Sequence, residues 1–240
     1  MSKKLLMSNN KGTINLPGYA SNGIILHLDA ISNTRNGNNT SSSVWEDLSG
    51  NDNDFTMISN GAVTFNDNYV QLNGVSGMKI IDFSKFKTLM STPNCFTLEV
   101  IVDFLNDTHN HNSPIFVNHS DLTISFGYWV NHIITNASNE ARHAWDSNDY
   151  HKDASFTAIT YKTSGDGTDI LYKDGVLLNK QSTVTDFYNS TSETVYIGRN
   201  GAGSAFYRGN IRSIRLYGRA LTEDEIYQNR QLDIERFNLE

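Results

Sequence analysis

The stretch FTLEVIVDF, residues 96–104, constrains the fold most strongly, because its side chains alternate in character along most of its length. One side of an extended backbone carries Leu98, Val100, Val102 and Phe104, and the other side carries Glu99, Ile101 and Asp103. Successive side chains of a β-strand point to opposite faces of its sheet. The pattern therefore predicts a strand with one face in an apolar core and the other at least partly exposed to water.

Similar short segments recur along the chain, separated by residues that favour turns. The clearest hairpin is DILYKDGVLL, where Asp174 and Gly175 lie between two alternating runs, since glycine accepts the positive φ of a tight turn. Further strands are predicted in GIILHLD, VTFNDNYVQL, SFTAITYKT, TVYIGRN and NIRSIRLY. No repeat of about 20–50 residues is present, which argues against a solenoid or propeller. These segments predict an all-β, two-sheet antiparallel sandwich.

One segment near the end of the chain has a helical pattern, in contrast to the rest. In RALTEDEI, Thr222 and Glu225 have the spacing of a capping box, and Leu221 and Ile226 have the spacing of a hydrophobic staple. We predict a short helix over about residues 222–235. Its apolar stripe is narrow, so we expect the helix to lie on the surface of the sandwich.

Charge and composition exclude several partners and settings. The net charge is -7, and no stretch of basic residues is long enough to follow a phosphate backbone, so we expect neither nucleic acid nor an anionic membrane as a partner. Residues 1–20 lack periodicity and contain Pro17 and Gly18, which predicts a flexible lead before a single domain at 21–240. The first residues do not have the apolar run of a signal peptide.

The order of the segments resembles that of laminin G-like domains of the concanavalin A-like lectin/glucanase superfamily, in its bacterial and phage branch. The matching pieces between residues 23 and 230 include WEDLSGNDNDFT, VTFNDNYVQLNG, FTAITYKTSGDGTDILYKDGVLL and YIGRNGAGSAFYRGNIRSIRLYGRALTEDEI. The resemblance implies a jelly roll of two curved antiparallel sheets that the RALTEDEI helix closes. It also implies that Trp45 lies in the core.

Hydrolysis of glycans is one activity of this superfamily, but the sequence does not favour it here. The two catalytic carboxyls of a glycosidase lie about 5–5.5 Å apart for retention or about 6.5–9.5 Å apart for inversion. Glu99 and Asp103 share a strand face, yet four residues of strand separate their backbones by roughly 13 Å. Ile101 occupies the position between them. We therefore predict that the protein is not an enzyme.

The stretch GYWVNHIITNASNEARHAWDSNDYHKD, residues 127–153, has the composition of a glycan-binding surface. Aromatic rings pack against the C–H face of a sugar, while amides, carboxylates and guanidinium groups bind its hydroxyls. The candidate residues are Trp129, Arg142, His143, Trp145, Asp146 and Tyr150. The alternative is that both tryptophans are core residues. That alternative is favoured for Trp129, and the two interpretations are evenly matched for Trp145.

The segment DLSGNDND, residues 47–54, supplies oxygen atoms of the kind that Ca²⁺ prefers. The candidate ligands are Asp47, Asn51, Asp52 and Asp54. The alternative, which the sequence favours, is a loop of Asx turns in which these side chains bind their own backbone. The resemblance implies a carboxylate partner just after the F-x-G-x-I segment, but this chain has Arg212 and Ser213 there.

The leading hypothesis is a non-catalytic binding module that recognises bacterial surface polysaccharide as part of a phage virion or tail. We expect it on a virion or an extracellular surface. The first alternative is a structural or decoration protein that binds other virion or surface proteins. The second alternative is a glycan hydrolase of the glucanase type.

Overall fold

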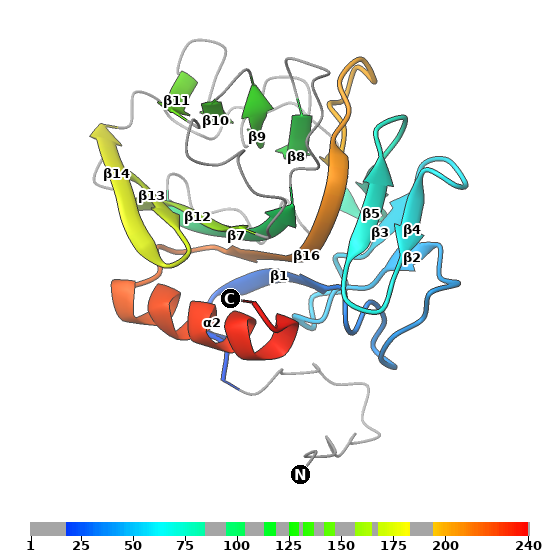
Figure 1. The fold of residues 1–240 in the computed structure, drawn as a ribbon, viewed down its shortest axis with the longest axis horizontal. Coiled ribbons are helices and arrows are strands. Elements are labelled where there is room, and N and C mark those ends of the chain that lie inside the picture. The colour runs from blue at the N-terminus through cyan, green and yellow to red at the C-terminus, as the bar shows by residue number, and fades with distance from the viewer. Residues whose placement is uncertain are drawn as a thin grey trace.

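The computed structural model describes residues 18–84, 95–103, 113–118, 125–129, 132–136, 142–146, 157–164, 168–182 and 194–239. In this described part, two antiparallel sheets are accompanied by the helix α2 (Glu223–Phe237) near the end of the chain (Figure 1). This mostly β architecture is consistent with the predicted jelly-roll sandwich and confirms the fold class. Within the described residues, no helix is long and apolar enough to cross a membrane.

The first sheet has the order β14-β13-β12-β7-β16-β5-β4, and β1 pairs with β16 beside this path. Its strands are β1 (Ile24–Asp29), β4 (Val63–Phe65), β5 (Val70–Asn73), β7 (Cys95–Asp103), β12 (Thr157–Ser164), β13 (Thr168–Lys173), β14 (Val176–Ser182) and β16 (Arg208–Tyr217). The expected hairpin joins β13 to β14, and both Asp174 and Gly175 have positive φ, 51° and 80°. Positive φ at both central residues is the geometry that a tight hairpin turn requires.

The second sheet has the order β11-β10-β9-β8-β15-β6-β3-β2. Its strands are β2 (Val44–Trp45), β3 (Phe55–Met57), β6 (Met78–Ile80), β8 (Ser113–Asn118), β9 (Ser125–Trp129), β10 (His132–Asn136), β11 (Arg142–Asp146) and β15 (Val195–Ile197). Strands distant in sequence become neighbours here, since β15 pairs with both β6 and β8.

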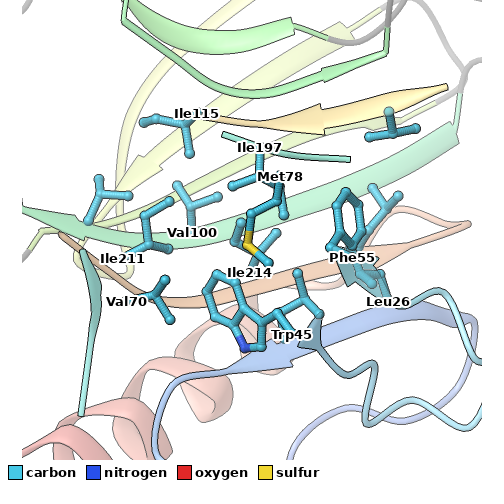
Figure 2. Packing of buried hydrophobic residues seen from close by; sticks show 14 of the residues in the cluster. Leu26, Trp45, Phe55, Val70, Met78, Val100, Ile115, Ile197, Ile211 and Ile214 are labelled. Carbon is cyan, nitrogen blue, oxygen red and sulfur yellow. The ribbon is translucent and has the colours of Figure 1, made fainter. Parts of the chain in front are cut away.

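The main apolar core lies between the two sheets (Figure 2). Leu98, Val100 and Val102 of β7 belong to it, as their alternation predicts. Trp45 is completely buried in the same core, which confirms its expected place, and its indole N–H donates to the backbone carbonyl of Asp29 at 3.1 Å. The indole is therefore both packed and hydrogen-bonded, as buried tryptophan usually is.

At Thr97, Glu99 and Ile101 the other face of β7 is also buried, so the expectation that this face is partly exposed to water is wrong at these positions. Glu99 is 4% exposed and Ile101 is 1% exposed. The reason is the helix α2 (Glu223–Phe237), which lies against the outer face of the first sheet beside β1 and β16 (Figure 1). Ile101 packs there against Phe237. A strand whose polar positions are covered by a helix shows the same alternation as a strand that faces water.

The start of α2 confirms the predicted capping box. The Thr222 hydroxyl accepts a hydrogen bond from the backbone N–H of Glu225 at 3.2 Å, and the Glu225 carboxylate accepts one from the backbone N–H of Thr222 at 2.9 Å. Leu221 and Ile226 are both buried in one apolar cluster with residues of β13 and β16. Local sequence thus fixes where the helix begins.

The buried side of α2 differs from a simple apolar stripe. The buried helix residues are Ile226, Asn229, Arg230, Asp233 and Phe237, and the middle three are polar or charged. The helix is therefore attached to the sheet by polar contacts as well as by packing. A polar residue on a covered helix face requires a partner, because an unpaired buried polar group costs free energy.

Candidate functional site

Five of the six predicted glycan-binding residues lie on β9 and β11, which flank β10 in an antiparallel meander at one end of the second sheet. Trp129 pairs with His132, and His132 pairs in turn with Asp146. Trp145 pairs with Ile133, one position along. The structure places the backbone of these strands, while the side chains of Trp129, Arg142, His143, Trp145 and Asp146 lie outside the described part, as does the whole of Tyr150.

The register divides the candidate residues between the two faces of the sheet. Residues directly opposite each other across a ladder share a face, and the next pair along lies on the other face. Trp129, Arg142 and Asp146 therefore share one face, and His143 and Trp145 share the other. The two tryptophans belong to opposite faces of the sheet.

The ladder relates these faces to described side chains of β15. One row runs from Arg142 through Asn136, Ser125 and Val117 to Tyr196, and the next runs from His143 through Thr135, Phe126 and Phe116 to Ile197. Ile197 is completely buried between the sheets, whereas Tyr196 is half-buried on the outer face, opposite the exposed Lys79. By register, Trp129 lies on the outer face and Trp145 on the core side.

In the predicted calcium loop, the Asp47 carboxylate is surrounded by hydrogen-bond donors. It accepts from the backbone N–H groups of His27, Ser49 and Asn53 at 2.9, 2.9 and 3.0 Å and from the Ser49 hydroxyl at 2.7 Å. Burial raises the pKa of Asp47 and these hydrogen bonds oppose the rise. The bond to Ser49 N–H closes an Asx turn, which was the alternative interpretation of this loop.

The other candidate ligands of this loop also have internal partners. Asp54 accepts from the backbone N–H of Asp47 at 2.8 Å and forms an ion pair with Arg35 at 2.5 Å. Asp52 pairs with the same guanidinium at 3.1 Å, and the Asn51 amide donates to the carbonyl of Ile24 at 3.0 Å.

Hydrogen bonds from within the protein therefore occupy the carboxylate oxygens of Asp47 and Asp54, and Asn53 Oδ1 is a buried oxygen of this loop without a partner in the described part. The described residues contain no group of three or more His, Cys, Asp or Glu placed to hold a metal ion. The Arg212 guanidinium donates to the Phe237 carbonyl, and Ser213 is buried at 1% exposed. The arrangement as described does not fit a Ca²⁺ ion, because a cation needs several free oxygen acceptors.

A buried set of charged and polar side chains lies between α2 and the first sheet, and sequence reasoning did not find it. We call this set the ionic cluster; its members are Tyr19, His27, Asp29, Glu99, Arg215, Asn229, Asp233 and Arg236. Its centre is Arg215 of β16, which is 2% exposed. The guanidinium donates to Glu99 at 2.8 Å and binds both carboxylate oxygens of Asp233, at 2.7 and 2.6 Å.

Glu99, the residue considered for catalysis, is a member of this cluster. Its carboxylate accepts from Arg215 and from the Asn229 amide at 2.9 Å. Burial raises the pKa of Glu99, and the Arg215 charge counteracts that rise. Because α2 covers it, Glu99 does not reach a substrate in this structure. Asp103 has a described backbone, but its side chain lies outside the described part.

The edges of the cluster connect α2 to β1 and to residues 18–20. Arg236 binds both carboxylate oxygens of Asp29, at 2.6 and 2.8 Å. Tyr19 donates from its hydroxyl to Asp233 at 2.8 Å, and the Arg215 guanidinium lies 4.5 Å from the centroid of its ring. The backbone N–H of Ala20 donates to Asn229 at 3.0 Å. The end of the expected lead, residues 18–20, is thus in contact with the domain.

A sequence signal for the cluster existed in part. Asn229 and Asp233 are four residues apart, so they share a helix face, and that spacing is visible in the sequence. Glu99 and Arg215 are separated by 116 positions, however, and only the pairing of β7 with β16 brings them opposite each other.

The chain belongs to the laminin G-like family whose model is described as the concanavalin A-like lectin/glucanases superfamily, since that model matches residues 65–227. The comparison with curated proteins found no match. Similar solved structures include a sialidase of Trypanosoma rangeli, with a TM-score of 0.62 and 20% identity. The alignment covers 90% of this chain and 33% of the sialidase chain. This protein is therefore similar in fold to about one third of the sialidase chain.

Two botulinum neurotoxin structures are also similar in fold. One, the binding domain of neurotoxin DC in complex with rat synaptotagmin II, has a TM-score of 0.62 and 14% identity over 88% of this chain and 52% of its own. The other is a structure of neurotoxin type C, a toxin whose cell entry depends on interaction with two ganglioside molecules. Its TM-score is 0.64 and its identity 13%, and the alignment covers 88% of this chain and 51% of the toxin chain. At these identities the likeness concerns the fold.

Proposed function

We propose that this protein is a non-catalytic carbohydrate-binding module and that the β9–β11 meander is its binding surface. The observation that carries the proposal is the register, which assigns Trp129 of β9 and Arg142 and Asp146 of β11 to the outer face of the meander. The superfamily includes lectins, and the cell entry of the similar neurotoxin type C depends on interaction with two ganglioside molecules. Both facts support carbohydrate as the ligand class.

The residue types on that face suit a sugar. An indole ring offers an apolar surface to the C–H side of a pyranose, and a guanidinium and a carboxylate bind hydroxyls in fixed directions. Trp129 and Asp146 lie in the same row with His132 between them, so two strand spacings of about 4.8 Å, roughly 10 Å in all, separate their backbones. A site that uses both residues therefore suits at least two linked sugars of a surface polysaccharide. His143, Trp145 and Tyr150 remain candidates for the opposite face and the adjoining loop.

Two matched variants test which face binds. We expect Trp129→Ala to weaken binding on a glycan array by at least tenfold, because stacking on an aromatic ring is lost. Trp145→Ala is the control from the other face, and circular dichroism checks that both variants are folded. Loss of binding with Trp145→Ala alone would move the site to the core-side face. Unchanged binding with both variants would remove the meander from the site.

The non-catalytic part of the proposal is supported by the burial of Glu99 and its pairing with Arg215. The glycan hydrolase alternative has the sialidase likeness on its side, but this chain aligns with only 33% of that enzyme. Incubation of the protein with bacterial surface polysaccharide and measurement of new reducing ends is the direct test. Release of reducing ends by the pure protein would contradict a binding-only role.

We also propose the setting that the sequence suggests, a phage virion or tail that contacts a bacterial surface. Gene neighbours that encode tail or capsid proteins would support it, and neighbours of metabolic function would contradict it. A structural or decoration role through protein contacts is the second candidate. The toxin binding domain in complex with rat synaptotagmin II supports that candidate, since a chain that contains a similar fold in about half of its length binds a protein. Pull-down of virion or surface proteins without any glycan binding would favour it.

A further inference from the structure

His27 is a buried titratable side chain in the ionic cluster. It lies on β1 under α2, is 3% exposed, and its Nε2 atom has no hydrogen-bond partner among the described residues. Its ring makes an edge contact with the Tyr19 ring, with the centroids 5.4 Å apart. Its cross-strand neighbour is Arg215. The imidazole therefore lies beside a fixed positive charge, without a carboxylate of its own.

The negative charges around His27 are already engaged by other donors. Asp47 accepts from the backbone N–H groups of His27, Ser49 and Asn53, and the three carboxylates of the ionic cluster are engaged as follows. Asp29 of β1 binds Arg236, Glu99 of β7 binds Arg215 and Asn229, and Asp233 of α2 binds Arg215 and Tyr19. The three carboxylates outnumber the two guanidinium groups by one formal charge. Each carboxylate nevertheless has a short contact with an arginine, so none is left to stabilise an imidazolium.

We propose that His27 makes the attachment of α2 and of residues 18–20 to the first sheet sensitive to acid. At neutral pH the uncharged imidazole fits under the helix. Uptake of a proton places a third positive charge beside Arg215 and Arg236 in a region closed to water. The proton is accommodated only when α2 and residues 18–20 separate from the sheet. This device is independent of whether the meander binds a glycan.

The direction of the pH effect follows from proton linkage. Burial, and then the charges of Arg215 and Arg236, hold the pKa of His27 well below its usual value of 6.5 in the closed state. The open state binds more protons below that value, so the closed state loses stability as pH falls below about 6.5. Glu99 acts in the opposite sense, because its pKa is raised in the closed state and acid favours its burial.

Hydrogen exchange of the α2 amides measures this opening directly. For one histidine with an open-state pKa of about 6.5, the opening constant rises about tenfold from pH 7.5 to pH 5.5. We therefore expect protection factors of α2, corrected for the intrinsic exchange rate, to fall about tenfold over this range. In His27→Gln, an uncharged residue that does not titrate, we expect that fall to disappear.

Glu225→Gln is the matched control. The Arg219 hydrogen bond lowers the pKa of Glu225 to about 2, so this carboxylate does not titrate between pH 5.5 and 7.5. Its loss should weaken α2 equally at both pH values. If His27→Gln does not fold, the protection factors of the wild type still test the proposal. Constant protection from pH 7.5 to 5.5 in the wild type, or an unchanged fall in His27→Gln, overturns the proposal.

Discussion

Around β7 and β16 the two faces of the first sheet are both closed to water, but they are closed by different kinds of interaction. On the inner face Leu98, Val100 and Val102 pack in an apolar core. On the outer face Glu99 and Arg215 meet Asp233 of α2 in the ionic cluster. Apolar packing is non-directional and roughly proportional to buried area, whereas buried charges require specific partners. The attachment of α2 to the outer face therefore depends on the presence of each charged partner in the ionic cluster.

The largest expected effect comes from breaking the cluster at its centre. Arg215→Met leaves Glu99 and Asp233 buried without their shared partner, and we expect the free energy of unfolding to fall by about 3–5 kcal/mol. Urea unfolding at pH 7 measures it. The control is a triple replacement, Glu99→Gln with Arg215→Met and Asp233→Leu, which removes the charges together.

The triple replacement sharpens the comparison of the two faces. If apolar packing can replace the ion pairs, its stability should lie close to that of the wild type or above it. A triple variant as unstable as Arg215→Met alone would show that the loss comes from poor packing of the new side chains rather than from unpaired charge.

A smaller effect is expected at the start of α2. Thr222→Ala removes the hydroxyl that accepts from the Glu225 N–H, and loss of such a cap costs about 1 kcal/mol. Thermal unfolding followed by circular dichroism is the measurement, and Thr222→Ser is the control that retains the hydroxyl. Equal losses in the two variants would contradict a capping role.

The smallest effect is expected from metal removal. The oxygens of Asp47 and Asp54 accept hydrogen bonds from the loop itself, so we expect neither Ca²⁺ nor EDTA to change Tm by more than the error of the scan. Differential scanning calorimetry with each additive checks this. A rise in Tm with Ca²⁺ that EDTA reverses would restore the calcium prediction for this loop.

Part of the fold was predictable because its causes are local. The alternation in β7, the Asp174-Gly175 turn and the Thr222–Glu225 capping box depend on residues close together in sequence, and each is confirmed. The order of the segments along the chain also predicted the concanavalin A-like superfamily. The cover over Glu99 was not predictable from the alternation, because a strand face turned to water and one turned to a polar helix face have the same pattern.

The faces on which the candidate site residues lie were likewise not predictable from local sequence. Composition drew attention to Trp129 and Trp145 and favoured the latter for sugar contact. Which face each residue joins depends on the pairing of β9, β10 and β11, and a register shift of one residue exchanges the faces. Pairing register is a property of the assembled sheet, and turn lengths in a polar segment specify it weakly.

The contacts of Asp29 have a consequence for the order of folding during synthesis. Asp29 lies 207 positions before its partner Arg236, and Tyr19 lies 214 positions before Asp233. A ribosome adds roughly 5–20 residues per second, so the first strand waits on the order of ten seconds or more for these partners. During that interval β1 also lacks β16, the strand with which it pairs, so β1 stays accessible to a chaperone until β16 and α2 arrive.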